Sequence, residues 1–392
     1  MRKNWAGNVT YSARAFHEPT TVAQVQSVLA SSDRARFLGT RHSFNGLADT
    51  DGDLISLAGL TSVVEIDSVA MAARVPGGMR YGELAEHLHG AGYGLHNLGS
   101  LPHLSVAGAV ATATHGSGTA NLATAVSSLE VVTALGEVIE LSGAGVPVSL
   151  GLLGAVTALT LKLEPAYEVR QFVYDDVAGP WRDVLSAAYS VSVFTAWDGR
   201  YQAWVKARDD FQAPASWRLA DGERHPIRGV SAQACTAQAG VPGPWHERLP
   251  HFRLSHTPSA GAELQSEFFV PLADAEAAIE AMASIGERLR PVLLISELRT
   301  VLADRLWLSP AYERDCLAIH FTWTQDTAAV LEAITLVQDV LRPFAPRPHW
   351  GKVFTMPISG LYPKLADFAA LIRAYDPKGK LRNTFVNTML AE

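Results

Sequence analysis

The stretch that decides how this chain is interpreted is Phe37-Leu38-Gly39-Thr40-Arg41-His42-Ser43. An apolar run that begins at Arg34 and is typical of a buried strand ends abruptly at the glycine. Glycine allows backbone conformations that a Cβ atom forbids, so main-chain amides can approach a large polar ligand closely. The imidazole of His42 can attach covalently to a cofactor, although a structural histidine explains the same pattern equally well.

A second segment, residues 99–118, consists almost entirely of small residues. Its hydroxyl groups belong to Ser100, Ser105, Thr112, Thr114 and Ser117. The backbone amides and hydroxyls of such a segment can enclose a diphosphate without any lysine or arginine. The segment lacks both the Gly-Lys-Ser/Thr ending of a P-loop and the Gly-x-Gly-x-x-Gly dinucleotide fingerprint. The alternative is a helix of small residues that packs closely against a neighbouring element.

The composition is that of a folded protein, because 48% of the 392 residues are hydrophobic and 18% are charged. A chain of this length exceeds a comfortable single core, so two domains are expected. The net charge of −7 argues against nucleic acid or an anionic membrane as a partner. The two cysteines cannot form a disulfide framework, and neither an apolar leader nor a membrane-spanning run is visible. We therefore expect a cytoplasmic monomer.

The pattern of apolar residues divides the chain into three parts. Residues 1–165 alternate strand-like runs with helices, as expected for an α+β nucleotide-binding domain. Residues 166–360 predict a second domain with a large antiparallel sheet backed by helices, and residues 361–392 form a C-terminal segment. The predicted strands are 34–38, 53–57, 63–66, 70–75, 129–134, 138–141, 155–163, 265–270, 292–301 and 316–323. One predicted helix begins at Thr20 or Thr21. The other predicted helices span 81–89, 273–289, 327–341 and 365–375.

Two strands of the second part carry polar side chains at positions that hydrophobic residues usually occupy. Glu297 and Arg299 are two residues apart in one strand, so both side chains leave the same face of the sheet. His320 and Thr322 repeat this spacing in the other strand. A face exposed to solvent would explain all four residues. A buried face would instead indicate a function, because buried ionisable groups are costly unless they are paired.

A third polar group lies in a loop close to the C-terminal segment. His349 and Lys352 are flanked there by Pro348 and Gly351, residues that fix a loop rather than the interior of an element. A lone lysine in such a position is usually a solvated surface charge. The residues alone therefore leave the role of this loop open.

Together, these segments resemble the FAD-binding domain of the vanillyl-alcohol oxidase family, and the likeness covers nearly the whole chain. It begins at Asn4-Trp5-Ala6-Gly7-Asn8 and includes Asp376-Pro377-Lys378-Gly379-Lys380 with Asn383 near the end. The most similar members of the family oxidise alditols, and the sugar-lactone oxidases are near relatives. The resemblance implies a two-domain α+β fold in which residues 361–392 return to the FAD-binding domain.

The resemblance implies FAD-dependent oxidation of the terminal primary hydroxyl of an alditol, such as xylitol or sorbitol, to the aldose. Hydride passes to flavin N5, and O2 is reduced to H2O2, so the expected partners are a polyol and O2. The alternative within the family is a sugar-1,4-lactone oxidase or dehydrogenase.

The resemblance also implies a role for individual residues, with the covalent bond to FAD assigned to His42. The other residues assigned to the cofactor are Phe37, Leu38, Gly39, Thr40, Arg41, Ser43, Ser100, Ser105, Gly108, Thr112, Ala113, Thr114, His115, Val156 and His349. The residues assigned to the substrate are Ser100, Glu297, Arg299, Thr322 and Lys352. Arg299 and Lys352 place positive charge near the developing alkoxide, which lowers the barrier, and His320 or a bound water accepts the proton.

Two other classes of protein are less consistent with the sequence. The 13 histidines invite the interpretation of a metal-dependent hydrolase. However, the chain contains neither a His-Glu-x-x-His motif nor a carboxylate–histidine cluster, so no metal site is expected. A non-catalytic flavin carrier would not need Glu297, Arg299 and Lys352 directed at one pocket.

Overall fold

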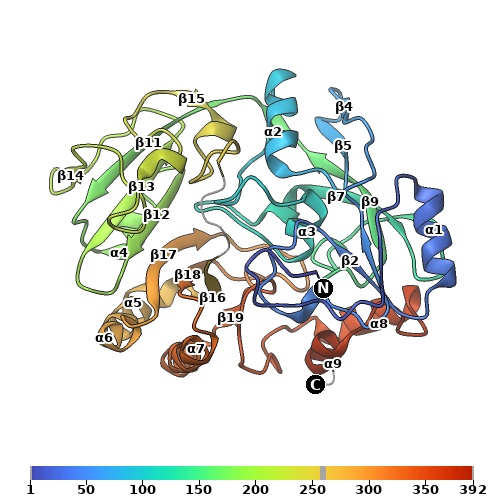
Figure 1. Cartoon of the computed structure of the whole chain (residues 1–392). Helices are drawn as coiled ribbons and strands as arrows, with labels where there is room; N and C mark the ends of the chain where they lie inside the picture. The colour runs from blue at the N-terminus through green and yellow to red at the C-terminus, as the bar shows by residue number, and fades with distance from the viewer. Residues whose placement is uncertain (1, 257–261, 391–392) are drawn as a thin grey trace.

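The computed structural model describes residues 2–256 and 262–390 (Figure 1). Its first part contains an antiparallel five-stranded sheet with strand order β4-β5-β9-β7-β8 and a parallel three-stranded sheet, β1-β3-β2. The strands are β1 (Ala15–His17), β2 (Ala35–Leu38), β3 (Asp53–Ser56), β4 (Glu65–Asp67), β5 (Ala72–Pro76), β7 (Val126–Val132), β8 (Val138–Leu141) and β9 (Ala155–Lys162). The helices are α1 (Val22–Ser31), α2 (Tyr81–Gly90) and α3 (Val106–Ala111).

Helix α1 shows how local sequence determines structure in this part. The Thr21 side chain accepts a hydrogen bond from Gln24 N and so satisfies one free amide of the first helical turn. Val25 and Leu29 lie one turn apart on the same face, and both are fully buried. The predicted helix is therefore confirmed, and the predicted strands 129–134 and 138–141 correspond to β7 and β8, which pair as an antiparallel hairpin.

The second part is built on an antiparallel nine-stranded sheet with main strand order β14-β11-β13-β12-β17-β18-β16-β19, and β15 pairs with β11 beside this path. The predicted large antiparallel sheet is confirmed. Its strands are β11 (Glu168–Asp175), β12 (Ser190–Thr195), β13 (Tyr201–Ala207), β14 (Arg218–Leu219), β15 (Gly243–Pro244), β16 (Leu264–Pro271), β17 (Leu293–Val301), β18 (Cys316–Trp323) and β19 (Arg347–Pro348). A separate antiparallel pair joins β6 (Tyr93–Gly94) to β10 (Glu164–Pro165).

Strands β11, β12 and β13 are not predicted by the sequence pattern. Every residue of β12 is buried, and so are the last five residues of β13. A strand that is covered on both faces loses the alternation of polar and apolar residues that identifies a half-exposed strand. The sequence signal of β12 and β13 is therefore weak, whereas β11, which does alternate between buried and partly exposed residues, is not explained in this way.

The two faces of the large sheet differ in chemistry. One face carries Leu298, Ile319 and Phe268. These side chains belong to the apolar core that also includes residues of helices α5 (Ala275–Ser284) and α7 (Thr327–Leu341). These helices lie under the sheet in Figure 1, together with α4 (Trp181–Leu185) and α6 (Gly286–Leu289). The opposite face carries buried ionisable side chains, which directly opposed strand positions bring together. The candidate site therefore lies on the face that carries the ionisable side chains.

The predicted helix 273–289 is two helices, α5 and α6, because the chain turns at Ile285. A Cβ atom at the next residue, Gly286, would collide with the carbonyl oxygen of Trp197. The glycine thus permits close packing of the second helix against the β12–β13 connection. The single predicted helix is wrong in this respect.

The C-terminal segment packs against the first part of the chain. It contains α8 (Leu365–Tyr375), which agrees with the predicted helix, and α9 (Thr384–Leu390). The Asn383 side chain donates hydrogen bonds to three carbonyl oxygens in residues 46–49.

We retain the division of the chain into domains at residues 165 and 360 as a proposal. Residues 1, 391 and 392 of the predicted domains lie outside the described structure. Within residues 2–256 and 262–390, no helix is long and apolar enough to cross a membrane.

Candidate active site

The centre of the polar sheet face is Glu267 on β16, whose side chain is completely buried. Its Oε1 accepts a hydrogen bond of 2.6 Å from Arg299 Nη2, and its Oε2 accepts one of 2.6 Å from Lys352 Nζ. Burial alone would raise the pKa of the Glu267 carboxyl, but Lys352 and Arg299 outweigh it and hold the pKa well below its ordinary value. Glu267 is therefore a carboxylate that two cations neutralise.

The sheet register places further ionisable groups beside Glu267. His320 on β18 lies directly opposite Glu267 on one side and directly opposite Glu297 of β17 on the other. Arg299 follows on β17, and both its neighbours across the sheet, Ser192 and Ala318, are small. We call Glu267, Glu297, Arg299, His320 and Lys352 the acid–base cluster. The predicted common face of the Glu297 and Arg299 pair and of the His320 and Thr322 pair is present, and it is buried rather than exposed to solvent.

Lys352 enters the cluster from the loop after β19. Its Nζ lies 2.6 Å from His320 Nδ1, and the other ring nitrogen, Nε2, lies 3.2 Å from Thr322 Oγ1. Burial, and then the charge of Lys352, lowers the pKa of His320 well below its ordinary value, so the imidazole is neutral. An ammonium group can only donate, so Nδ1 accepts from Lys352 and Nε2 carries the proton toward Thr322.

Arg299 connects the cluster to the segment of small residues. Its Nη1 lies 3.4 Å from Ser100 Oγ and 3.4 Å from the backbone oxygen of His115. The His115 ring is buried, with Nε2 3.3 Å from Glu267 Oε1. Burial, and then Arg299, lowers the pKa of His115, which favours a neutral ring. The structure therefore brings the predicted substrate residues Ser100, Glu297, Arg299, Thr322 and Lys352 into one network, in which Ser100 and Lys352 are partly exposed and the other three are buried.

Sequence reasoning missed Glu267, although the signal that found Glu297 applies to it equally. It is an acid within the predicted strand 265–270, between Ser266 and two phenylalanines. It also missed His251, which lies in a loop and approaches Glu297 Oε1 to 2.7 Å through Nε2. No local sequence feature marks that histidine as part of the site.

The loop after β2 has an unusual surplus of free backbone donors. The amides of residues 39–43, which we call the cofactor loop, donate no hydrogen bond to any described part of the chain. Arg41 within it has a left-handed backbone, with φ of 66°. Turns of this type direct successive amides at one anion. Phe37 and Leu38 precede the loop as the end of β2, where they contact the apolar core.

The segment of small residues packs directly against the cofactor loop. Ser105 N donates a 3.2 Å hydrogen bond to Thr40 Oγ1, and a Cβ atom on Gly39 would collide with Ser105 Oγ. Helix α3 follows Ser105 and contains Gly108, so part of this segment is the packed helix that the alternative interpretation describes. Thr112 ends the helix, and Ala113 takes a left-handed φ of 55°. Neutral donors thus surround the loop, which fits the polar part of FAD.

His42 lies within the cofactor loop and packs against the N-terminal residues. Its ring stacks on Trp5 with the ring centroids 5.1 Å apart, and its Nδ1 lies 3.0 Å from Thr40 Oγ1. Burial is the largest influence on its pKa, which falls to about 4, and so the imidazole is neutral near pH 7. Ser43 and Phe44 then join the loop to the residues around Lys352, since Phe44 N donates to Gly351 O at 2.7 Å.

Three of the predicted cofactor residues lie at the edges of the region where the cofactor loop packs against the segment of small residues. Val156 is a buried residue of β9, and its carbonyl oxygen lies so close to Gly77 that a Cβ there would collide with it. Thr114 follows Ala113, and a Cβ on Gly99 would approach its methyl group to 3.2 Å. His349 is buried and stacks on Phe269, with its Nδ1 accepting from Gly351 N at 3.1 Å.

His349 also belongs to a group of potential metal ligands. One ligand atom from each of His115, Glu267 and His349 lies within 4.8 Å of the others. Glu267 is already neutralised by Arg299 and Lys352, so a divalent cation here would face two positive charges at short range. The charge distribution therefore disfavours a metal ion at this position.

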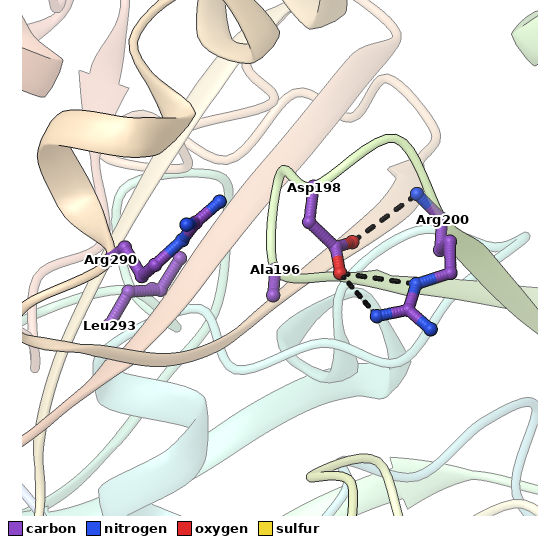
Figure 2. Close-up of a pocket in the computed structure, with 5 residues that line it drawn as sticks. All are labelled: Ala196, Asp198, Arg200, Arg290 and Leu293. Atoms are coloured by element: carbon purple, nitrogen blue, oxygen red, sulfur yellow. Dashed lines mark hydrogen bonds and ion pairs between the residues drawn. The ribbon is translucent and has the colours of Figure 1, made fainter.

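A surface pocket of about 490 Å³ lies elsewhere, lined by Ala196, Asp198, Arg200, Arg290 and Leu293. Figure 2 shows that Asp198 hydrogen-bonds both the backbone and the side chain of Arg200. Arg228 also contacts Asp198, at 2.6 Å. No residue of the acid–base cluster lines this pocket, and each of its charged residues forms an ion pair, Arg290 with Glu287 outside the lining.

Comparisons with known proteins agree with this geometry. Residues 13–142 match a family model described as an FAD binding domain, and residues 262–389 match one described as D-arabinono-1,4-lactone oxidase. An alditol oxidase from Streptomyces sp. is 48% identical, covering 99% of this chain and 98% of that protein. An L-gulono-1,4-lactone dehydrogenase from Mycobacterium tuberculosis is 27% identical over 99% of this chain and 98% of that protein. A cholesterol oxidase structure from B. sterolicum has a TM-score of 0.78 at 13% identity, over 99% of this chain and 96% of that one, and so shares the fold.

Proposed function

Because this chain belongs to the alditol oxidase family of FAD-dependent oxidoreductases, we propose that it oxidises the terminal primary hydroxyl of an alditol, of the xylitol or sorbitol type, to the aldose. O2 is the proposed electron acceptor, and H2O2 is the second product. The observation that supports this proposal best is the buried acid–base cluster, which adjoins neutral hydroxyl groups. FAD, when bound, supplies the acceptor for the hydride.

Glu297, Thr322 and Ser100 are the proposed binding groups for the polyol. The Glu297 carboxylate accepts hydrogen bonds from substrate hydroxyls, and the two hydroxyl side chains exchange one hydrogen bond each. Burial alone would raise the pKa of the Glu297 carboxyl, but Arg299 and His251 lower it instead, so it stays charged. A site of this kind rejects ligands that lack hydroxyls, because its own polar groups would then remain buried and unpaired.

Arg299 and Lys352 are the proposed electrostatic catalysts. Together with Glu267 and Glu297 they form a balanced set of two cations and two carboxylates within one network. A substrate alkoxide that develops beside the two cations is stabilised without any rearrangement of the protein. The one free lone pair of neutral His320, on Nδ1, already accepts from Lys352 at 2.6 Å, so a bound water is the proposed acceptor of the proton that leaves the hydroxyl.

Specificity constants for polyols of decreasing length test the substrate class. We expect xylitol and sorbitol to exceed glycerol, and simple aliphatic alcohols to be nearly inert, because each unsatisfied partner costs about 1–3 kcal/mol. Glu297→Gln should flatten this ranking, whereas Glu332→Gln, at an exposed position of α7, should not alter it. If a sugar lactone surpasses every open-chain polyol, the lactone-oxidising alternative is correct.

We also propose that His42 bonds FAD covalently through its imidazole. A neutral, half-buried ring beside the free amides of the cofactor loop supports this assignment. Acid precipitation should leave the yellow colour with the wild-type protein and with His87→Ala, which changes an exposed histidine. His42→Ala should release the colour into the supernatant. Release of colour from the wild-type protein would contradict the proposal.

A further inference from the structure

Two buried residues extend the acid–base cluster beyond Glu297. His251 Nε2 lies 2.7 Å from Glu297 Oε1, and Lys206 Nζ, on β13, lies 3.0 Å from His251 Nδ1. The exposed fractions of Lys206, His251 and Glu297 are only 1%, 3% and 4%. The three side chains form a row that ends on a proposed polyol-binding carboxylate, and Ser192 Oγ approaches His251 Nε2 from the side at 3.4 Å.

The donors and acceptors of this row allow one arrangement of protons. The Glu297 carboxylate can only accept, so the proton of the neutral His251 ring stays on Nε2 and His251 Nδ1 accepts from Lys206. His251 Nε2 then donates to the Glu297 carboxylate. Burial, followed by the charge of Lys206, lowers the pKa of His251 to about 4, which agrees with a neutral ring. Phe194 and Trp204 pack against the ring edge-to-face and restrict its rotation.

The burial of the Lys206 ammonium group is unfavourable for the stability of the folded protein. Its ammonium donates to the Leu249 carbonyl oxygen and to His251, and within the described residues no carboxylate forms an ion pair with it. Burial lowers its pKa to about 7, which is the mark of a lysine held in unfavourable surroundings. A methionine of similar length would fill the same space without charge. The lysine therefore needs an explanation other than packing.

We propose that Lys206 and His251 are positioning residues that fix Glu297 for the recognition of an open-chain polyol. Both contacts of the Glu297 carboxylate engage Oε1, one from His251 at 2.7 Å and one from Arg299 Nε at 3.4 Å. The carboxylate is thereby held in one orientation, and Oε2 is the oxygen that receives two adjacent hydroxyls of the substrate. This inference rests on the proposed function, because it assumes that Glu297 binds polyol hydroxyls.

A double-mutant cycle tests whether His251 acts through Glu297. His251→Leu removes the hydrogen bond to a charged group, so we expect kcat/KM for xylitol to fall roughly 10- to 100-fold, mostly through KM. His251→Gln should recover most of this loss, because an amide nitrogen can replace Nε2 as donor. In a Glu297→Gln background, His251→Leu should change kcat/KM less than about twofold, since coupled residues are not additive.

The outcomes separate this inference from the proposed function. If Glu297→Gln leaves the polyol ranking unchanged, the proposed function itself is contradicted. If Glu297→Gln flattens the ranking but the effect of His251→Leu is additive with it, only the positioning role is wrong. A similar loss in His251→Gln and His251→Leu would also overturn it, because a donor at that position would then be irrelevant.

Nitrogen-15 NMR provides a readout that does not depend on turnover. The His251 signal, identified by its loss in His251→Gln, should show an unprotonated Nδ1 and a protonated Nε2 in the flavin-loaded wild-type protein. Lys206→Met should leave Nε2 protonated, because Glu297 still accepts from it, but should shift the Nδ1 signal through loss of the Lys206 hydrogen bond and raise KM for xylitol more than it lowers kcat. A protonated Nδ1 in the wild-type protein, or an unchanged Nδ1 signal and unchanged KM in Lys206→Met, would refute the proposal.

Discussion

The cofactor loop and the acid–base cluster adjoin each other, yet they are built in opposite ways. The loop offers free backbone amides, small side chains and a neutral histidine. The cluster offers buried carboxylates, a guanidinium and an ammonium that neutralise one another. Backbone donors bind a polar ligand by shape at little electrostatic cost, whereas buried charges are held in advance for a step that develops charge.

This difference predicts where each region is vulnerable. A cluster of paired charges fails when one member is removed, because its partner then remains buried and uncompensated. A loop of free amides fails when a side chain occupies the space that the backbone needs. Four substitutions, taken in order of decreasing effect, test this contrast.

Glu267→Gln should cause the largest loss. It leaves Arg299 and Lys352 without their shared carboxylate, so we expect the free energy of unfolding to fall by about 3–5 kcal/mol. Urea unfolding of the flavin-loaded protein measures this change. Glu332→Gln, an identical change at an exposed site, should alter the free energy by less than about 0.5 kcal/mol. Equal stability of the two variants would show that the network does not depend on Glu267.

Lys352→Met should affect the chemical step more than substrate affinity. The loss of positive charge near the developing alkoxide should raise the barrier by about 3 kcal/mol, or roughly 100-fold in rate. Stopped-flow measurement of anaerobic flavin bleaching at saturating xylitol gives this rate. Lys162→Met removes an exposed lysine and serves as the control. Weaker binding with an unchanged rate of bleaching would contradict the assignment.

Lys206→Met should change how stability depends on pH. Burial lowers the pKa of Lys206 from 10.5 to about 7 in the folded protein. Between these values the unfolded chain binds more protons than the folded one, so the lysine makes stability rise with pH. From pH 7 to 9.5 the wild-type protein should gain about 3 kcal/mol relative to Lys206→Met. Urea unfolding at both pH values measures the difference, and an equal pH dependence of the two proteins would contradict it.

Gly39→Ala should have the smallest effect, and it probes the loop alone. The new Cβ collides with Ser105 Oγ, a side-chain atom that can rotate, so we expect a loss of about 1 kcal/mol and reduced flavin loading. The ratio of flavin to protein absorbance measures loading. Adding Ser105→Ala removes the colliding oxygen and should restore most of it. If the double variant loads no better than Gly39→Ala, the collision is not the cause.

Local patterns were sufficient to predict much of the fold. Thr21 and the apolar face of α1 are adjacent in sequence, and so are the residues that form the β7–β8 hairpin. The cofactor loop was also recognisable, because glycine and a histidine follow a strand within a few residues. The spacing of Glu297 and Arg299 predicted a common face, since strand geometry has a period of two residues.

The parts that could not be predicted depend on distant contacts. Glu267 lies 32 residues from Arg299 and 85 residues from Lys352, so its importance arises only from the register of β16, β17 and β18. His251 and Lys206 meet across 45 residues, between a loop and a strand whose pattern is obscured by burial on both faces. No local periodicity in the sequence predicts a contact between residues so far apart.

Arg36 makes the strand before the cofactor loop depend on the C-terminal segment. This buried side chain lies on β2 and donates to the carbonyl oxygens of Leu47, Leu150 and Leu381. Arg36 and Leu381 are 345 residues apart, so β2 lacks one of these acceptors until the C-terminal segment has packed against the first part of the chain. Because contacts of such long sequence separation form slowly, we expect the loop to reach its final conformation late in folding.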